Sequence, residues 1–572
     1  MPKIHILDEA TVNKIAAGEV IERPASVVKE LIENSIDAGA TDIKIEIEKG
    51  GKRLIRITDN GCGMDREDAA LSFVKHSTSK IQTIEDIERV LTMGFRGEAL
   101  SSICAVAKVV IVTKSKETLA GTKLVIHGGK LNGISDTGAP DGTSITVEDL
   151  FFNTPARKKY MRSDSTELAH IVDIVTKNAL GHNNVSLTLL HNGNVLIRSP
   201  ASKLLETMLH IYGQEVAEEM FSVNFSSRFA TFTGLISKPA ITRGTMDAQS
   251  FYINSRNVAS RALSIALRKG YGTLLPQGRF PIAVVKISVD TTEVDVNVHP
   301  TKNQVRLSHE WEISDALTLA VNDALSNKEL SPQVKTMQSL LYEKIEIPPL
   351  IREEISQFRA PVKDTQRRLR RTELGIGENV NAEKPNVKVL GQVDALYVIA
   401  GTNNGLMIID QHAAHERILF EQVRDSKRSD SQELIVPINL DLDPKEKVLM
   451  KECKPDLEEF GFRISEFGPD TFAVTAIPRV LGKLEDPGLV HDIIIDILSE
   501  GKIKDETGIF DRVTKSIACR GAIKAGANCT YEQMDGLIEQ LFKTQNPYTG
   551  PHGRPTMVSF NKEALDKLFK RS

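Results

Sequence analysis

Two side chains suited to a metal-bound phosphate stand one helical turn apart near the N-terminus. In PASVVKELIENSIDAGA, Glu30 and Asn34 are four residues apart, so a helix would place them on the same face. Asn offers a neutral oxygen to Mg²⁺, while Glu can orient and deprotonate a water. An ordinary solvated helix face is the alternative explanation for such a pair.

Two glycine-rich segments could complete a nucleotide site. Asp59 begins DNGCGM, where a carboxylate could accept an amino group while the backbone closes over a ligand, although DNG is also a common turn. GFRGEAL opens the apolar stretch 99–106, and N–H groups at a helix start favour phosphates. No GxxxxGK[ST] sequence occurs, which excludes a Walker-type nucleotide site.

A second candidate site, in the C-terminal third, has the chemistry of a metal site. LMIID predicts a buried strand that ends at Asp410, and QHAAHERILFE predicts a helix with Asp410 at its N-cap. His412 and Glu416 share one face of that helix, and an imidazole with carboxylates suits Zn²⁺ or Mn²⁺. A capped helix with His and Glu on its surface is the alternative.

Regular patterns predict the elements that must hold the N-terminal residues. Pro24 suits the first turn of a helix. The apolar residues after it recur at helical spacing and predict a buried stripe: Val27, Val28, Leu31, Ile32 and Ile36. IKIEIE and RLIRIT alternate with period two and predict a hairpin joined by KGGK.

The whole chain divides into four segments. A length of 572 residues suggests about three to four folded units. Alternating helical and strand patterns fill residues 1–204, and a second α/β unit with a basic helical segment fills 205–327. Residues 328–386 are polar and broken by Pro and Gly, as in a flexible linker, and periodicity returns over 387–572.

Composition excludes several classes of protein. The sequence has neither the ~18 uninterrupted apolar residues of a membrane helix nor a basic-then-apolar leader. Five cysteines at irregular positions exclude a disulfide scaffold and favour the reducing cytosol. The net charge of −4 leaves DNA binding open, because binding depends on local basic patches. We expect a cytoplasmic protein with no membrane partner.

The motif set resembles that of the GHKL ATPases. ExxxN, DNGCGM, KHSTSKI, GFRGEAL and DGTSITVEDLFFNTPARKK occur in the order and spacing of that family. ENSIDAGAT, GFRGEAL and FFNTPARKK are similar to its MutL branch, which acts in DNA mismatch repair. The resemblance implies a multidomain α/β (α+β) fold. A GHKL ATPase sandwich would occupy 1–204, a ribosomal S5 domain 2-like transducer domain 205–327, and an α+β dimerisation and endonuclease domain 387–572.

The same resemblance implies roles in binding and hydrolysing ATP with Mg²⁺. Glu30 would be the general base, Asn34 the Mg²⁺ ligand, and Lys302 a catalytic lysine that reaches the γ-phosphate from the transducer domain. Asp59 would accept the adenine amino group. The other implied nucleotide contacts lie beside the base, in a lid over 76–80 and at a phosphate-binding helix start: Gly63, Thr143, Thr78, Lys80, Arg96, Gly97, Glu98, Ala99 and Leu100.

The C-terminal motif resembles that of the MutL endonucleases. DQHAAHERILFE matches their DQHAxxExxxxE, and ACR and PHGRP are its usual companions. The resemblance implies a catalytic Mn²⁺ or Zn²⁺ site with these ligands: Asp410, His412, Glu416, Cys519 and His552. It also suggests helper residues: Glu421, Arg520 and Arg554. Gly550 stands where the family often has Cys, so one soft ligand is missing, and water, Cys529 or Cys453 could replace it.

Two further segments suggest partners. FYINSRNVASRALSIALRKGYG carries basic residues that could bind DNA phosphates without reading sequence, or form a solvated face: Arg256, Arg261 and Arg268. QELIVP resembles the sliding-clamp motif of endonuclease-type MutL and could dock as an extended peptide, or be an edge strand. Its candidate clamp contacts are Gln432, Leu434, Ile435 and Pro437.

The expected function is that of a homodimeric, ATP-dependent DNA mismatch repair protein of the nucleoid. It would couple a MutS-type mismatch recognition protein to repair and nick DNA. The alternative is a matchmaker that cuts nothing and whose C-terminal metal site is structural. The intact DQHAAHERILFE argues against that alternative, and Gly550 argues mildly for it. A type II topoisomerase ATPase subunit shares the N-terminal motifs, but the rest of the chain offers no candidate domain for its cleavage chemistry.

Overall fold

The computed structural model describes most of the chain outside the predicted linker. The described residues are 21–80, 93–94, 97–275, 279–295, 306–326, 387–425, 431–467, 471–479, 487–499, 514, 516–518, 528–551, 554–563 and 565. The predicted linker, 328–386, lies outside them, as do five predicted site or helper residues: Arg96, Lys302, Cys519, Arg520 and His552. Within the described parts, no helix is long and apolar enough to cross a membrane.

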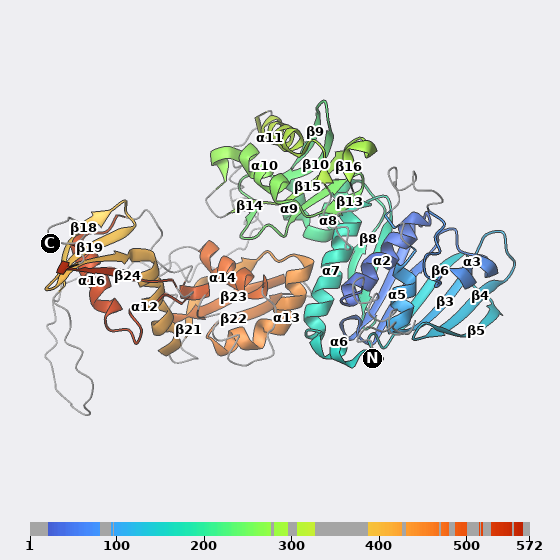
Figure 1. Cartoon of the computed structure of the whole chain (residues 1–572), viewed down its shortest axis with the longest axis horizontal. Helices are drawn as coiled ribbons and strands as arrows, with labels where there is room; N and C mark the ends of the chain where they lie inside the picture. Colours follow the sequence, from blue (N-terminus) through green and yellow to red (C-terminus); the bar gives the residue numbers. More distant parts are fainter. Residues whose placement is uncertain are drawn as a thin grey trace, which may run out of the picture.

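The N-terminal unit is one mixed sheet covered by helices (Figure 1). Its strand order is β5-β4-β3-β6-β2-β1-β7-β8, in which β1 and β7 run parallel and the other neighbours antiparallel. The strands are β1 (Asp42–Glu48), β2 (Leu54–Asp59), β3 (Lys108–Lys114), β4 (Gly121–His127), β5 (Lys130–Thr137), β6 (Gly142–Glu148), β7 (Ser186–His191) and β8 (Asn194–Ser199). The helices are α2 (Pro24–Asp37), α3 (Arg66–Leu71), α5 (Ala99–Val106), α6 (Pro155–Tyr160) and α7 (Asp164–Gly181).

Local sequence explains the elements that carry the N-terminal motifs. Helix α2 begins at Pro24, and its apolar stripe enters the same core as residues of α5, α7 and the sheet. β1 and β2 form an antiparallel hairpin whose connection needs glycine at Gly50, with a φ of 61° and a Cβ position only 2.2 Å from the Asp164 carbonyl oxygen. The predicted helix, the predicted hairpin and the helix after GFRGEAL are therefore confirmed.

The second unit is a five-stranded sheet with two long helices packed on it. The order is β13-β12-β15-β10-β9, with β9 (Met220–Ser226), β10 (Thr231–Ser237), β12 (Gln249–Ile253), β13 (Arg256–Val258) and β15 (Ala283–Ser288). α10 (Arg261–Tyr271) and α11 (Glu310–Ser326) share its core. The predicted basic helix is confirmed as α10, which starts after Ser260, whose hydroxyl accepts the Leu263 N–H at 3.2 Å.

Smaller elements connect the second unit to its neighbours. Helices α8 (Leu204–Tyr212) and α9 (Gln214–Glu218) lead into it from the N-terminal sheet. Two short ribbons lie at its edges, β11 (Thr242–Arg243) with β14 (Phe280–Pro281), and β16 (Val294–Asp295) with β17 (Arg306–Leu307). The β11–β14 ribbon contacts the C-terminal part of the chain, as described below.

The C-terminal part has two halves with separate cores. The first is the sheet β18-β19-β20-β24 with helices α12 (Gln411–Asp425) and α16 (Tyr531–Leu541). Its strands are β18 (Lys388–Val393), β19 (Tyr397–Thr402), β20 (Gly405–Asp410) and β24 (Met557–Asn561). The second is the sheet β21-β23-β22, of β21 (Ser431–Leu440), β22 (Arg463–Phe467) and β23 (Thr471–Pro478), with α13 (Pro444–Glu459) and α14 (Pro487–Ser499).

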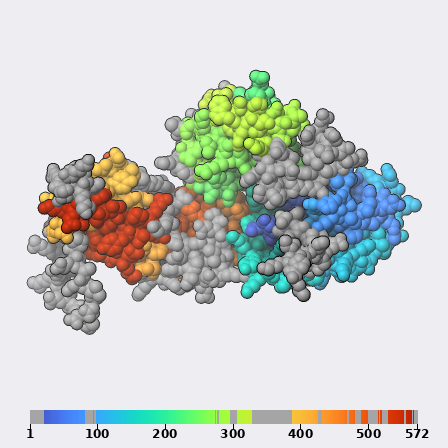
Figure 2. All heavy atoms as spheres, viewed as in Figure 1, coloured from blue at the N-terminus to red at the C-terminus, as the bar shows by residue number. Residues whose placement is uncertain are grey.

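The two halves lie at different distances from the N-terminal unit. In the space-filling view, the yellow and dark-red residues of the first half occupy the end of the molecule farthest from the blue sheet (Figure 2). The second half lies between, with α13 packed on α7 (Figure 1). The mixed α/β architecture expected from the sequence is confirmed.

Candidate functional site

Helix α2 presents the polar face that the first site requires. Glu30 and Asn34 lie on it, half-buried and one turn apart. The ammonium group of Lys80, from the predicted lid, donates to Asn34 Oδ1 at 2.9 Å and to Asp37 Oδ2 at 2.6 Å. The Lys80 ammonium group therefore lies against the oxygen predicted to bind Mg²⁺, and Asn34 and Asp37 together form the face of α2 that accepts from it, called the cation face below.

Asp37 also fastens the segment before GFRGEAL to α2. Its carboxylate accepts the Met93 N–H at 3.0 Å and the Gly94 N–H at 3.1 Å, and its side chain is only 7% exposed. A Cβ at Gly94 would lie 3.0 Å from Lys80 Nζ, so glycine leaves room for that ammonium group. Asp37 thus links the cation face to the turn before the predicted phosphate-binding helix start.

Asp59 lies at the end of β2, opposite Thr143 of β6 in the strand register. Its carboxylate accepts the Ser35 hydroxyl at 2.8 Å, the Gly61 N–H at 2.9 Å and the Thr143 N–H at 3.3 Å. Burial raises the pKa of Asp59 above its ordinary value, and these three hydrogen bonds oppose that shift. Ser35 neighbours Asn34, so the proposed base pocket adjoins the cation face.

Position 63 requires glycine because of its backbone conformation and because of the atoms that lie close to it. Its φ is 69°, and a Cβ would lie 2.0 Å from the Lys114 carbonyl oxygen. Beside it, the Met64 N–H donates to the Thr113 hydroxyl at 2.9 Å, which pairs with the Thr143 hydroxyl at 3.0 Å. The turn after β2 therefore packs directly on β3, beside the strand β6 that carries Thr143.

The predicted lid and the predicted phosphate-binding turn contact each other. The His76 N–H donates to the Gly97 carbonyl at 3.1 Å, and the His76 ring lies 3.4 Å from the Glu98 carboxylate. Gly97 has a φ of 63°, and a Cβ there would lie 2.5 Å from the Ser77 carbonyl oxygen. Thr78 accepts the Lys80 N–H at 3.2 Å, while Ala99 and Leu100 open α5. The described nucleotide candidates thus come together around α2.

The C-terminal metal candidates lie at the junction of β20 and α12. Asp410 Oδ1 accepts the His412 N–H at 2.9 Å and the Ala413 N–H at 3.0 Å, so the predicted N-cap is confirmed. His412 Nε2 lies 3.3 Å from Glu416 Oε1, and Glu416 is buried. Burial and the neighbouring His412 lower the pKa of His415. The part of the chain that the structure describes contains no group of three potential metal ligands.

The rest of the DQHAAHERILFE helix holds a loop in place. Glu421 accepts the Gln545 N–H at 2.6 Å and the Asn546 N–H at 3.2 Å. Arg417 Nε donates to the Thr549 carbonyl at 2.6 Å. This loop leads to Gly550, where a Cβ would lie 3.9 Å from the Ala413 carbonyl oxygen of α12. Residue 550 therefore borders the helix that carries His412 and Glu416.

The two cysteines considered as substitutes for a ligand at position 550 have different surroundings. Cys453 is buried in the hydrophobic core of the other C-terminal half. The Cys529 thiol lies 3.6 Å from the Gln411 carboxamide oxygen, at the first residue of α12. Cys453 is therefore a core residue, and Cys529 remains the cysteine nearer to the candidate metal helix.

The QELIVP segment lies in β21, at the edge of its sheet, and it bulges. Gln432 and Glu433 pair with β23, and pairing resumes only at Ile438. Within the bulge, Ile435 is 102% exposed and Val436 74% exposed, whereas Leu434 packs partly against the core. Pro437 is exposed. The segment is therefore an edge strand in position, and its two exposed apolar side chains, Ile435 and Val436, face solvent.

The basic residues of the second unit do not form one surface. Arg256 is only 7% exposed, in β13, and burial lowers its pKa despite nearby Glu33 and Asp37. Its inclusion in an exposed DNA-binding face was wrong, because β13 points it into the protein. The Arg268 guanidinium lies over the Phe280 ring at 5.5 Å. Arg261, at the start of α10, is exposed.

Comparison with known proteins covers the three units. Residues 21–132 match the family model for histidine kinase-, DNA gyrase B- and HSP90-like ATPases, and 208–326 match that for the C-terminal domain of DNA mismatch repair proteins. Residues 390–529 match the MutL C-terminal dimerisation domain. The chain is 45% identical to the DNA mismatch repair protein MutL of Methanoculleus marisnigri over 588 residues, covering all of both chains. It belongs to the MutL family.

A second relative supports the same family membership. The DNA mismatch repair protein MutL of Methanothrix thermoacetophila is 41% identical over 576 residues, again with full coverage of both chains. Family membership means that this MutL protein contains an ATPase domain of the GHKL class and a C-terminal dimerisation domain. Helix α2, with Glu30 and Asn34, lies within the part of the chain that matches the ATPase model.

Sequence reasoning missed three residues that organise these sites in this MutL chain. Asp37 follows Asn34 by three residues and Glu30 by seven, a helical spacing that could have revealed it. Ser35 and Arg417 gave no comparable signal, because their partners, Asp59 and Thr549, lie far away in the sequence.

Proposed function

We propose that this MutL protein is an ATP-dependent, metal-dependent DNA endonuclease of mismatch repair. It would act in the cytoplasm, at the nucleoid, as a homodimer joined by its C-terminal domain. A MutS-type mismatch recognition protein and a sliding clamp are its proposed partners. DNA would be bound without regard to sequence, with Arg261 and Arg268 as the candidate contacts.

The proposal of DNA cleavage rests on one arrangement of donors. Asp410 ends the half-buried strand β20 and caps α12, and the His412 imidazole and Glu416 carboxylate meet as a pair one turn along. Nitrogen and carboxylate oxygen donors of this kind fit Mn²⁺ or Zn²⁺. A bound metal would lower the pKa of a water and stabilise charge on the leaving oxygen of the phosphodiester. The fold orients these donors, because helix N–H groups hold the Asp410 carboxylate and burial restricts the Glu416 side chain.

ATP turnover is assigned to the face of α2. Glu30 would orient and deprotonate the attacking water, and Asn34 would hold the Mg²⁺ that accompanies ATP. Lys80 donates to Asn34 and Asp37, so it must leave that oxygen when Mg²⁺ binds and can then turn toward the phosphates. Asp59 would accept the adenine amino group, with Gly63 beside the base and Thr143 helping to hold it. Lys302 is proposed to reach the γ-phosphate from the transducer domain.

A non-cutting matchmaker with a structural metal site is the second candidate. Gly550 favours it, because the residue bordering α12 carries no thiolate to bind a metal. A Cβ at this position would make only ordinary contacts, the shortest being 3.5 Å to the Arg554 carbonyl oxygen. Gly550→Cys should therefore fit and add a soft ligand, which elemental analysis would register as higher zinc content per chain.

Nicking of supercoiled plasmid in the presence of Mn²⁺ tests the endonuclease directly. Asp410→Asn and Glu416→Gln each keep side-chain shape and remove a negative charge, so each should lower the nicking rate at least ~100-fold. Asp535→Asn, an exposed change on α16 of the same domain, is the matched control and should nick normally.

Measuring ATP hydrolysis shows whether a variant that has lost nicking is still folded. Asp410→Asn should hydrolyse ATP at the wild-type rate, because the ATP and metal candidates lie in different domains. Glu30→Ala should do the reverse and keep basal nicking. If Asp410→Asn nicked plasmid as fast as the wild type, the endonuclease assignment would be wrong and the matchmaker would be preferred.

A further inference from the structure

The second C-terminal half is packed directly against the two N-terminal units. Ala169 of α7 belongs to the same hydrophobic core as Leu449 and Cys453 of α13. In the other direction, Val448 of α13 packs against the core of the N-terminal unit. The contact thus has an apolar centre to which both sides contribute.

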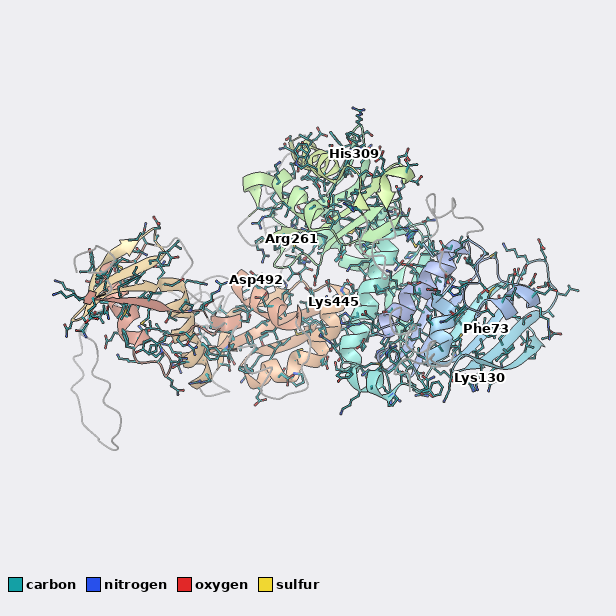
Figure 3. All side chains as sticks on the ribbon, viewed as in Figure 1. Phe73, Lys130, Arg261, His309, Lys445 and Asp492 are labelled. Atoms are coloured by element: carbon teal, nitrogen blue, oxygen red, sulfur yellow. The ribbon has the colours of Figure 1, made fainter. Side chains whose placement is uncertain are left out.

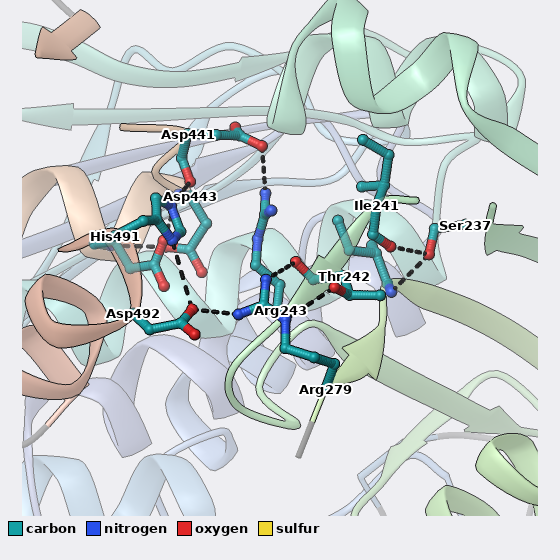
Figure 4. Close-up of polar contacts among 11 residues, drawn as sticks. Ser237, Ile241, Thr242, Arg243, Arg279, Asp441, Asp443, His491 and Asp492 are labelled. Carbon is teal, nitrogen blue, oxygen red and sulfur yellow. Dashed lines mark hydrogen bonds and ion pairs between the residues drawn. The ribbon is translucent and has the colours of Figure 1, made fainter. Parts of the chain in front are cut away.

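Ion pairs surround this centre (Figure 4). Arg243, on the β11–β14 ribbon, lies 2.9 Å from Asp441, which directly follows β21, and the Arg243 side chain is only 8% exposed. Arg279 forms an ion pair with Asp492 of α14 and is aimed by Thr242, whose hydroxyl and carbonyl accept from it at 3.0 and 3.1 Å. Two arginines of the transducer domain therefore meet two carboxylates of the C-terminal domain.

A third pair has the opposite polarity. Lys445 of α13 lies 3.1 Å from Asp247, and Figure 3 places Lys445 and Asp492 on the side of the C-terminal half that faces the N-terminal units. Glu452 of α13 accepts the Ser163 hydroxyl, which caps α7, at 3.5 Å. Because the charges alternate in sign along the contact, sliding or rotating the domain would bring like charges together, so the pattern specifies one register.

The contact also has a cost that limits its strength. Asp443 and Glu446 form the capping box of α13, and Asp443 faces Asp173 and Tyr212 across a small cavity. Burial, and then the neighbouring Asp443, raise the pKa of Glu446 to about 8. Removing two adjacent carboxyl groups from water opposes docking.

The remaining charged groups around these carboxyls compensate only in part. Arg243 and Lys445 face Glu446 and Asp443 and oppose the rise in the pKa of both. His170 of α7 stays neutral, because burial and the nearby cations Arg23 and Lys445 lower its pKa to about 4. A contact with a small apolar centre, partly exposed ion pairs and buried carboxyls is suited to opening and closing.

We propose that the C-terminal domain docks reversibly, through Asp441, α13 and α14, on α7 and the β11–β14 ribbon of its own chain. Helix α7 stands between α13 and α2, the helix of Glu30 and Asn34, and contacts both (Figure 1). Docking therefore places the C-terminal domain one helix away from the ATPase site. Residues 327–386 join the two parts, which keeps the local concentration of the docking partner high.

Zero-length carbodiimide coupling of the full-length dimer tests the contact. Lys445 and Asp247 are close enough to be joined by an amide, which peptide mass spectrometry would identify. Lys543 and Glu539, 2.8 Å apart and exposed at the C-terminal end of α16, provide the internal control for coupling yield. We expect both cross-links, and we expect high salt to lower only the first, because it screens the ion pairs of the docking contact.

Charge reversal makes the test specific. Asp441→Arg and Arg243→Glu should each lower the Lys445–Asp247 cross-link roughly fivefold or more, and the double variant should recover most of it. Asp535→Arg changes the charge by the same amount away from the contact and should have no effect. Absence of the cross-link in the wild type beside a normal control cross-link, or failure of the double variant to recover it, overturns the proposal.

A mixed dimer shows whether the C-terminal domain docks on its own chain or on the partner protomer. One protomer carries Asp247→Asn and its partner carries Lys445→Gln, with different tags for purification. Neither chain can then form the cross-link within itself, so the proposal predicts its disappearance. Persistence of the cross-link would mean that each C-terminal domain docks on the partner protomer, which overturns intramolecular docking.

Discussion

Replacing Asp59 by asparagine isolates its proposed contact with adenine. Oδ1 accepts from the Gly61 and Thr143 N–H groups, and an asparagine oxygen in that position would keep both bonds. The new NH₂ group would replace Oδ2 and donate to the Ser35 hydroxyl oxygen, which frees the hydroxyl proton for the Leu31 carbonyl, 3.1 Å away. The local hydrogen-bond network therefore survives the change.

Folding should not suffer from this substitution. The pKa of Asp59 is raised in the folded protein, so ionising this carboxyl costs folding free energy at every pH above that raised value. The neutral isostere removes that cost. At neutral pH the melting temperature of the nucleotide-free protein should be unchanged or slightly higher.

Nucleotide binding should weaken instead. The adenine amino group would meet an NH₂ donor where it had met a carboxylate. Loss of a hydrogen bond to a charged group is worth about 1.5–3 kcal/mol, which corresponds to a roughly 10- to 150-fold rise in Kd. An inosine nucleotide, which carries an oxygen acceptor at this position, should lose less affinity than ATP or even gain some.

Equilibrium titration calorimetry with ATP and ITP measures both effects. Asp42→Asn, on the neighbouring strand and exposed, is the matched control and should bind like the wild type. An unchanged Kd for ATP together with an unchanged preference for ATP over ITP would refute the role of Asp59 at the base.

Two further predictions concern the C-terminal domain. Ile435→Ala with Val436→Ala should abolish any stimulation of nicking by a sliding clamp without lowering stability, because both side chains are exposed. Leu434→Ala is unsuitable, since Leu434 packs on the core; stimulation that persists in the double variant would contradict clamp binding here. Docking should also depend on pH, because burial, part of it in the docking contact, raises the pKa of Glu446 to about 8 in the docked form. The docked form binds the extra proton, so docking should weaken as pH rises from about 5 to 8 and then level off. Fluorescence energy transfer between dyes on the two domains measures docking as a function of pH. Glu446→Gln should flatten that pH profile, and an unaltered profile would show that another group titrates.

Much of the N-terminal site could be predicted from short-range pattern. The apolar stripe of α2 determines which face is buried, and Glu30 and Asn34 follow on the other face from helical spacing alone. The same holds for Asp410, because an N-cap bond joins residues only two and three positions apart. Such interactions depend on local geometry, which the order of residues specifies directly.

Contacts between distant segments were decided by the tertiary structure. Arg256 looks like its neighbours in a basic stretch, but strand pairing in β13 buries it. Glu421 looks like part of a metal motif, yet in the fold it holds the N–H groups of residues 545 and 546. The docking of α13 on α7 joins residues nearly three hundred positions apart, such as Ser163 and Glu452. No periodicity or helix cap encodes these pairings, because they depend on how whole sheets and helices pack. The local sequence around a side chain is the same whether that side chain contacts water or a distant helix.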